Sequence, residues 1–153
     1  MTLRALIALC FFACFEANAS SPLEASLREL SCGADHVLVG RVVGVDMIDA
    51  KRRPIHDDAA GTGPGSKNTI RLEVEVLEVI ETTEADFPPT LKIPLDPVMH
   101  YSLGQIRAAH AEPSEPRLVF LSGAKHEPII AGRFFWGLDA REEALVLRRE
   151  CKP

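Results

Sequence analysis

Residues Ile70–Glu81 read IRLEVEVLEVIE and form the clearest β-strand pattern in the chain. Apolar and charged residues alternate from Ile70 to Val76, so one face of the strand is hydrophobic and the other is charged. Such alternation predicts a half-buried strand, and the charged face excludes a strand that is buried on both sides. Beyond Val76 the alternation changes phase, because Leu77 is apolar where the charged face should continue. A one-residue bulge at Val76–Leu77 would restore the phase and bend the strand, which suits a small antiparallel barrel.

The other predicted strands lie on both sides of this segment. His36–Ile48 is apolar on both faces and contains two glycines, Gly40 and Gly44, which favour sharp bends in a central strand. Pro94 cannot donate a ladder hydrogen bond and therefore places the strand that contains it at a sheet edge. The shorter predicted strands are Thr90–Leu95, Arg117–Leu121, Arg133–Leu138 and Ala144–Arg148.

Two short helices are also predicted. Ser21 and Glu24 form a capping box at the start of the first helix, which ends at Gly33. Ser102 and Gln105 can open the second helix between the third and fourth strands. Three strands, a short helix and two or three more strands match the element order of an OB-fold. The predicted fold is therefore mostly β, an OB-like antiparallel Greek-key barrel of five to six strands, and a fold alone does not define a function.

Met1–Ala19 has the features of a signal peptide. A basic residue precedes the apolar run Leu6–Phe15, and Ala17-Asn18-Ala19 is an A-x-A cleavage site. The apolar run is shorter than the ~20 residues that a membrane-spanning helix needs. A core helix and a lipoprotein signal with Cys14 as the lipidated residue are the alternatives. The favoured interpretation predicts a periplasmic or secreted protein without stable membrane insertion after cleavage.

Cleavage would leave residues 20–153, a length typical of a single domain. The mature chain would keep the net charge of −5, which is a poor match to a nucleic-acid backbone. It would also keep two cysteines, Cys32 and Cys151. An even cysteine count in an exported chain predicts one disulfide. A metal pair or a redox pair is the alternative, although redox pairs usually have the C-x-x-C spacing, which these cysteines lack.

Two groups of residues are candidates for a binding surface. His56, Asp57 and Asp58 have side chains that can ligate a metal, but they lie in the Gly- and Pro-rich segment Asp49–Asn68, which predicts an exposed loop. The favoured interpretation is a solvated loop, and no metal or cofactor is expected.

The second group is the aromatic cluster Phe134-Phe135-Trp136. In a strand Phe134 and Trp136 would share one face and Phe135 would point away. Core packing is the favoured role for at least one face. Phe135 or Trp136 could also belong to a binding face, because OB barrels often present aromatic side chains to ligands.

Several segments resemble small exported domains with a netrin-like or tissue-inhibitor-of-metalloproteinase-like OB barrel. They are Cys32, HVLVGRVVGV from His36, IRLEVEVLEV from Ile70, RLVFLSG from Arg117, and Cys151. In the metalloproteinase inhibitors an N-terminal cysteine of the mature chain chelates the protease zinc. This chain differs, because its predicted mature terminus is Ser20 and its first cysteine lies behind a helix. The resemblance therefore does not imply inhibition by that wedge.

The sequence lacks the motifs of common catalytic sites, including a nucleophile elbow, a zinc-protease helix and paired metal-binding cysteines. We therefore expect a non-catalytic exported binding module whose partner is an envelope or extracellular protein. A secreted or periplasmic protease inhibitor that uses an exposed loop or edge strand is the main alternative. An envelope hydrolase that uses scattered histidines and aspartates is the third.

Overall fold

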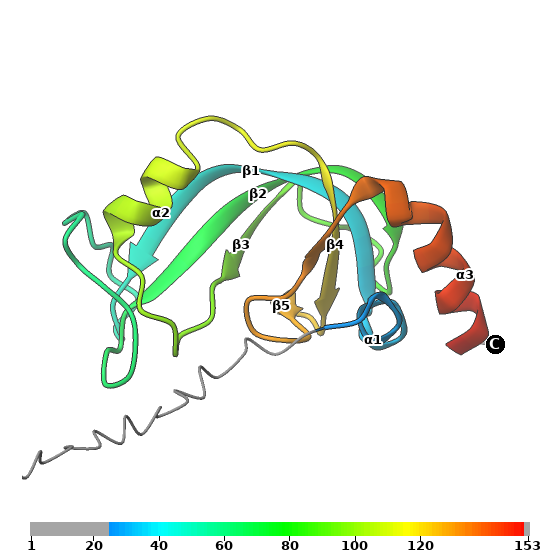
Figure 1. Ribbon diagram of the computed structural model, residues 1–153, viewed down its shortest axis with the longest axis horizontal. Helices are drawn as coiled ribbons and strands as arrows, with labels where there is room; N and C mark the ends of the chain where they lie inside the picture. The colour runs from blue at the N-terminus through cyan, green and yellow to red at the C-terminus, as the bar shows by residue number, and fades with distance from the viewer. Residues whose placement is uncertain (1–24, 152–153) are drawn as a thin grey trace, which may run out of the picture.

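The computed structural model describes residues 25–151 (Figure 1). The predicted signal peptide and the predicted helix cap at Ser21 lie outside this range. The elements in chain order are α1 (Leu27–Gly33), β1 (His36–Ile48), β2 (Thr69–Glu81), β3 (Thr90–Pro94), α2 (Leu103–Ala109), β4 (Arg117–Ser122), β5 (Glu127–Pro128), β6 (Phe135–Trp136), the 3-10 helix η1 (Leu138–Ala140) and α3 (Arg141–Cys151).

The strands form one antiparallel sheet in the order β3-β2-β1-β4-β5, and β6 also pairs with β4. The two long strands β1 and β2 arch across the molecule, with α2 near one end and α1 and α3 near the other (Figure 1). The predicted bulge is confirmed, because Gly40 pairs with Val76 and Val39 with Glu78, which leaves Leu77 without a partner in the register. The predicted edge position of Pro94 is confirmed, since β3 is the outermost strand beside β2.

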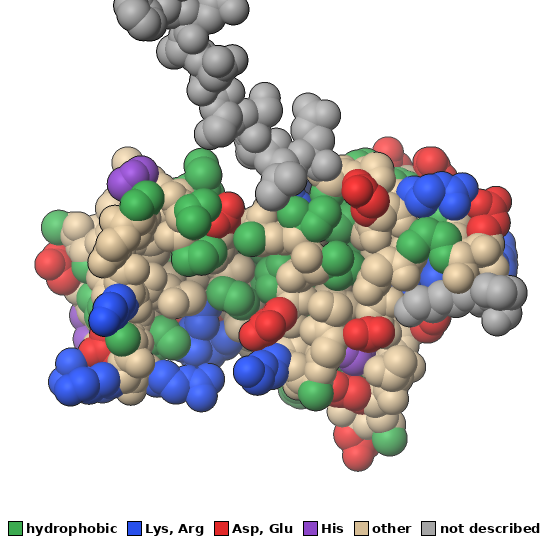
Figure 2. All heavy atoms as spheres, turned by 90° about the horizontal axis from the view of Figure 1, so that it is seen from below, with side chains coloured by type: hydrophobic (Ala, Val, Ile, Leu, Met, Phe, Trp, Pro, Cys, Tyr) green, Lys and Arg blue, Asp and Glu red, His purple; other side chains and the backbone are tan. Residues whose placement is uncertain are grey.

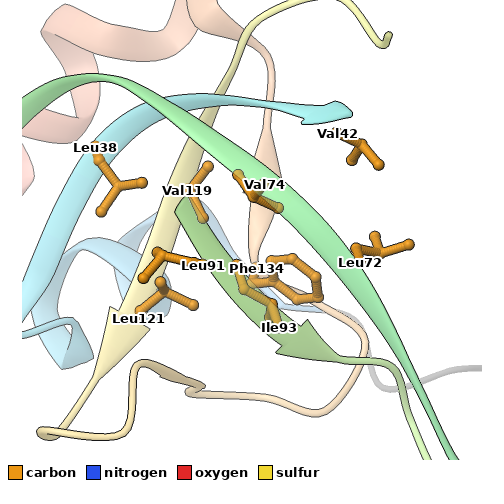
Figure 3. Close-up of a cluster of buried hydrophobic side chains, with 9 residues drawn as sticks. All are labelled: Leu38, Val42, Leu72, Val74, Leu91, Ile93, Val119, Leu121 and Phe134. Carbon is orange, nitrogen blue, oxygen red and sulfur yellow. The ribbon is translucent and has the colours of Figure 1, made fainter. Parts of the chain in front are cut away.

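Residues 36–40 of the central strand β1 are buried on both faces, as the sequence predicts, whereas Val43 further along the strand is 40% exposed. One face contributes to the core under the arch of the sheet, shown in Figure 3, whose buried residues are Leu38, Val42, Leu72, Val74, Leu91, Ile93, Val119, Leu121 and Phe134. The opposite face packs on α1 and α3 through a second core made of Leu27, Leu30, Ala34, Val37, Val39, Leu118, Phe120 and Ala144. A third, smaller cluster of Met47, Ile70 and Leu103 anchors α2.

Within residues 25–151 the sheet is not closed, so the predicted closed barrel is not confirmed. β3 and β5 face each other as neighbouring edges but form no ladder. β5 is only two residues long, and Pro128 lacks the N–H that would extend its pairing. The predicted strand Arg133–Leu138 shrinks to Phe135–Trp136, because Gly137 is already the cap of η1.

Both predicted helices near the N-terminus and after β3 are present. α1 begins later than its sequence suggested, with Ser26 as N-cap and Glu29 completing the capping box. α2 has the predicted capping box between Ser102 and Gln105. Among residues 25–151, no helix combines the length and apolar character that crossing a membrane requires.

The predicted strand Ala144–Arg148 is wrong, because this segment lies inside α3. The two buried residues of α3 are Ala144 and Arg148, four positions apart, which is the spacing of one helix face. Acidic residues in the first turn and basic residues in the last turn match the helix dipole. Cys151 therefore ends a helix rather than a strand. α1 and α3 pack together and bring the Cα atoms of Cys32 and Cys151 to 5.5 Å, within disulfide range.

Candidate functional site

The three predicted binding residues of the Asp49–Asn68 loop have separate roles in the described part of the chain. His56 is exposed. The Asp57 carboxylate accepts a hydrogen bond of 2.9 Å from the Ala59 backbone N–H, and Asp58 forms a 2.7 Å ion pair with Arg107 of α2. These carboxylates thus hold the loop in place. The three residues do not form a metal-ligand cluster within residues 25–151, which removes the arrangement that would have favoured a hydrolase.

The aromatic cluster contributes mostly to the two cores. Phe134 and Phe135 both pack into the core under the arch, with ring centroids 4.5 Å apart, whereas Trp136 packs against the second core. The predicted pairing of Phe134 and Trp136 on one face is wrong, because Phe134 precedes the two-residue strand β6. Phe135 and Trp136 are half-buried and line a surface cavity of about 350 Å³. They retain a partly open face as a candidate contact surface.

Another surface feature lies between the unpaired edges of β3 and β5. We call it the open seam and define it by two cavities of about 300 and 310 Å³, which share Pro94 and Glu127. The first is mainly apolar and is otherwise lined by Thr69, Leu95, Pro97, Pro128 and Ala131. The second is basic and is otherwise lined by Ile48, Arg52, Arg71, Lys92 and Lys125. Figure 2, a view of the molecule from below, shows hydrophobic side chains across the middle of that face, with Lys and Arg side chains beside them.

Only some of the positive charges in the seam are already neutralised. Burial disfavours the charged form of Asp46, but hydrogen bonds from Arg71 and Lys92 outweigh it and hold the pKa of that carboxyl below its ordinary value. The carboxylate therefore stays ionised and orients both cations, at 2.6 and 2.8 Å. Among residues 25–151, Arg52 and Lys125 are exposed and have no ion-pair partner. The seam thus offers two free cations next to an apolar surface.

A second candidate site is a cluster of His36, Glu84 and His126. It is the group within residues 25–151 whose ligand atoms converge, with one atom from each residue within 4.8 Å of the others. Nε2 of His126 lies 3.1 Å from the Glu84 carboxylate, and Nε2 of His36 lies 3.9 Å from it. His36 is 1% exposed, whereas the side chains of His126 and Glu84 are partly exposed. The cluster therefore lies at the surface, and His36 is its buried member.

Neighbouring groups hold the two imidazoles in place. Nδ1 of His36 lies 2.8 Å from the Thr82 hydroxyl, and Nε2 lies 3.2 Å from the Gly123 carbonyl oxygen. The Thr82 hydroxyl also accepts a 3.1 Å hydrogen bond from the Glu84 backbone N–H. The Phe87 ring packs against both histidines, with centroid distances of 5.3 Å to His36 and 4.8 Å to His126.

Sequence reasoning missed this cluster because its members are far apart in the chain. Their positions nevertheless follow from the strand pairing: His36 begins β1, Glu84 follows β2, and His126 follows β4. β1 runs antiparallel to both β2 and β4, so its first residues must lie beside the ends of those two strands. A correct pairing of the predicted strands was the one signal that could have revealed the site.

The other histidines lie elsewhere. The His100 ring packs over Gly63, where a Cβ atom would come within 2.5 Å of Nδ1. Burial, followed by the charge of Arg117, lowers the pKa of His110, so this imidazole stays neutral to lower pH than usual. Neither ring belongs to the cluster of His36, Glu84 and His126.

Comparisons with known proteins do not assign the chain to a family. No protein-family model matches it, and no curated protein matches it in sequence. The resemblance to netrin-like and metalloproteinase-inhibitor-like domains therefore stays a prediction.

Proposed function

We propose that the protein is an exported, non-catalytic binding module with an OB-like fold that binds a partner protein at the open seam. The observation that supports this proposal is the pair of adjoining cavities, one apolar and one basic, between the edges of β3 and β5. Concave sites that combine an apolar lining with a few charged groups are the usual form of binding sites.

The chemistry of the seam defines the ligand it would accept. Its apolar part is lined by Leu95 and Pro97, and Val98, the next residue in sequence, is 63% exposed. Arg52 and Lys125 supply positive charge that stands out against the net charge of −5 of the whole chain. We therefore infer that the partner is an envelope or extracellular protein that presents an exposed segment with an acidic side chain next to an apolar one. Charge complementarity of this kind speeds association and favours the correct partner.

Reversing a charge in the seam should reduce binding. Peptides selected by display on the mature protein should be enriched in acidic residues next to apolar ones. Lys125→Glu should weaken their binding by at least about tenfold, because close charge pairs at interfaces contribute about 1.5 kcal/mol or more. Fluorescence polarisation at two salt concentrations measures both the affinity and its expected decrease with salt.

Arg149→Glu is the matched control, because Arg149 is also an exposed basic residue but lies on α3, away from the seam. Equal binding by the wild type and Lys125→Glu would contradict the seam as the binding site. A protease panel tested with the same two variants distinguishes the alternative function: inhibition that is lost only in Lys125→Glu would make the partner a protease.

Export can be tested separately from binding. When the gene is expressed with its natural N-terminus, the mature protein should begin at Ser20, because Ala17-Asn18-Ala19 fits the cleavage site of a signal peptidase. Intact-mass spectrometry of the exported fraction measures this directly. An intact Met1, or a lipid attached to Cys14, would contradict cleavage after Ala19.

A further inference from the structure

We propose that His36, Glu84 and His126 bind a divalent transition-metal ion such as zinc. This inference is independent of binding at the open seam. Two imidazole nitrogens and one carboxylate oxygen form a donor set that suits zinc, copper and nickel, whereas calcium and magnesium prefer oxygen ligands. Such a His₂Glu set leaves one position of a tetrahedral zinc ion for water.

To hold an ion, the three ligand atoms must move closer together. Zinc–ligand distances near 2.05 Å place tetrahedral ligands about 3.3 Å from one another. Nε2 of His126 lies 3.1 Å from Oε2 of Glu84, and Nε2 of His36 lies 3.9 Å from Oε1 of the same carboxylate. The widest separation among the three ligand atoms is no more than 4.8 Å. His126 and Glu84 are the partly exposed members, so their side chains can close this gap by rotation.

The surroundings of His36 match those of a metal ligand. A ligating histidine usually donates its second ring N–H to a neighbouring acceptor, which fixes the orientation of the ring. The Thr82 hydroxyl at Nδ1 can accept such a bond. Nε2 lies 3.2 Å from the Gly123 carbonyl oxygen, to which it can only donate, so a metal at Nε2 would replace this hydrogen bond, with the ring proton on Nδ1 toward Thr82. The Phe87 ring adds an apolar wall beside both imidazoles, which limits water at the site.

The backbone of His126 provides a second, independent observation. Its φ angle is 54°, in the left-handed region that non-glycine residues rarely adopt. Gly123, in the same turn between β4 and β5, also has a positive φ of 64°, which glycine adopts without steric cost. A glycine or asparagine would suit the position of His126 better, and residues held in such conformations concentrate at functional sites. From this position Nε2 of the His126 imidazole lies 3.1 Å from the Glu84 carboxylate.

Bound metal would join three segments that are remote in sequence. His36 begins β1, Glu84 lies in the connection between β2 and β3, and His126 lies in the turn between β4 and β5. Metal binding should therefore protect this end of the sheet from opening, since an ion that binds only the folded state stabilises it. The same turn carries Lys125, which lines the basic cavity of the open seam.

The test is a titration of the mature, disulfide-bonded protein, without a histidine tag, by isothermal calorimetry with zinc, nickel, calcium and magnesium salts. We expect one zinc ion per chain, binding of nickel at the same site, and no binding of calcium or magnesium at the same concentrations. His126→Asn should lower zinc affinity by at least about 100-fold, which is the upper end of the loss on removing an outer-shell partner. Glu84→Gln should have a similar effect. His56→Asn is the matched control, because His56 is exposed and lies outside the cluster.

Two further measurements separate a metal ligand from a structural residue. Asparagine tolerates the left-handed conformation, so the apo form of His126→Asn should be at least as stable as the wild-type apo protein. Thr82→Val should lower zinc affinity about 10- to 100-fold by removing the partner of His36, and Thr82→Ser should restore it. Absence of zinc binding by the wild type, or unchanged zinc affinity in His126→Asn, would overturn the proposal. Equal losses in His126→Asn and His56→Asn would also overturn it.

Discussion

Replacing Cys32 with serine is expected to lower the free energy of unfolding by about 4–5 kcal/mol, the value that the chain-entropy model gives for a loop of about 100 residues. The Cα atoms of Cys32 and Cys151 lie 5.5 Å apart although 119 positions separate them in sequence. A bond between them would close nearly the whole described chain into one loop. The loss is comparable to the total stability of a small domain, ~5–15 kcal/mol, so the variant should be close to unfolding at physiological temperature. Urea denaturation of the wild type and the variant measures the difference.

The double variant Cys32→Ser/Cys151→Ser is the matched control for this prediction. Because either single change removes the same cross-link, the double variant should be destabilised by about as much as the single variant. Thiol labelling of the unfolded, unreduced wild-type protein gives an independent check. Two labels per chain would show that both cysteines are free and would contradict the predicted disulfide.

Local patterns in the sequence predicted the long strands correctly, because those patterns extend over many residues. The alternation from Ile70 to Val76 and its change of phase at Leu77 identified both β2 and its bulge. The two apolar faces of His36–Ile48 identified the central strand. These features depend on each strand's own faces, so they are visible without knowledge of the partners.

The short elements could not be predicted in the same way, because their conformation depends on tertiary contacts. Ala144–Arg148 is apolar enough for a strand, and only the burial of Ala144 with Arg148 reveals the helix face. β5 and β6, each with two residues, exist only because β4 offers them an edge.

The candidate sites show the same contrast between what local sequence indicates and what tertiary contacts decide. His56, Asp57 and Asp58 are adjacent in sequence, yet Asp58 pairs with Arg107 and Asp57 caps a turn. His36 and His126 are remote in sequence, yet strand pairing places their ring centroids 5.0 Å apart. Adjacency in sequence therefore gave a poor indication of which side chains converge.

Arg148 is the residue whose role was least visible in the sequence. It is only 3% exposed and lies at the contact between α1 and α3. One terminal nitrogen of its guanidinium donates to the carbonyl oxygens of Ser31 and Ala34, at 2.9 and 2.7 Å. Its Nε forms an ion pair with Glu81 at the end of β2. The last carbonyls of a helix have no partner within that helix, and Arg148 donates to two carbonyls at the end of α1.

Arg148→Met should destabilise the protein by about 2 kcal/mol or more. Methionine keeps the apolar stem but removes the charged donor, and hydrogen bonds to charged groups contribute about 1.5–3 kcal/mol. Urea denaturation measures the change, and the neighbouring exposed residue provides the matched variant Arg149→Met, which should change stability by less than about 0.5 kcal/mol. Arg148→Lys should recover only part of the loss, because an ammonium group lacks the planar fork that reaches both carbonyls and Glu81 together. Equal stabilities of Arg148→Met and Arg149→Met would contradict a stabilising role of the guanidinium between α1 and α3.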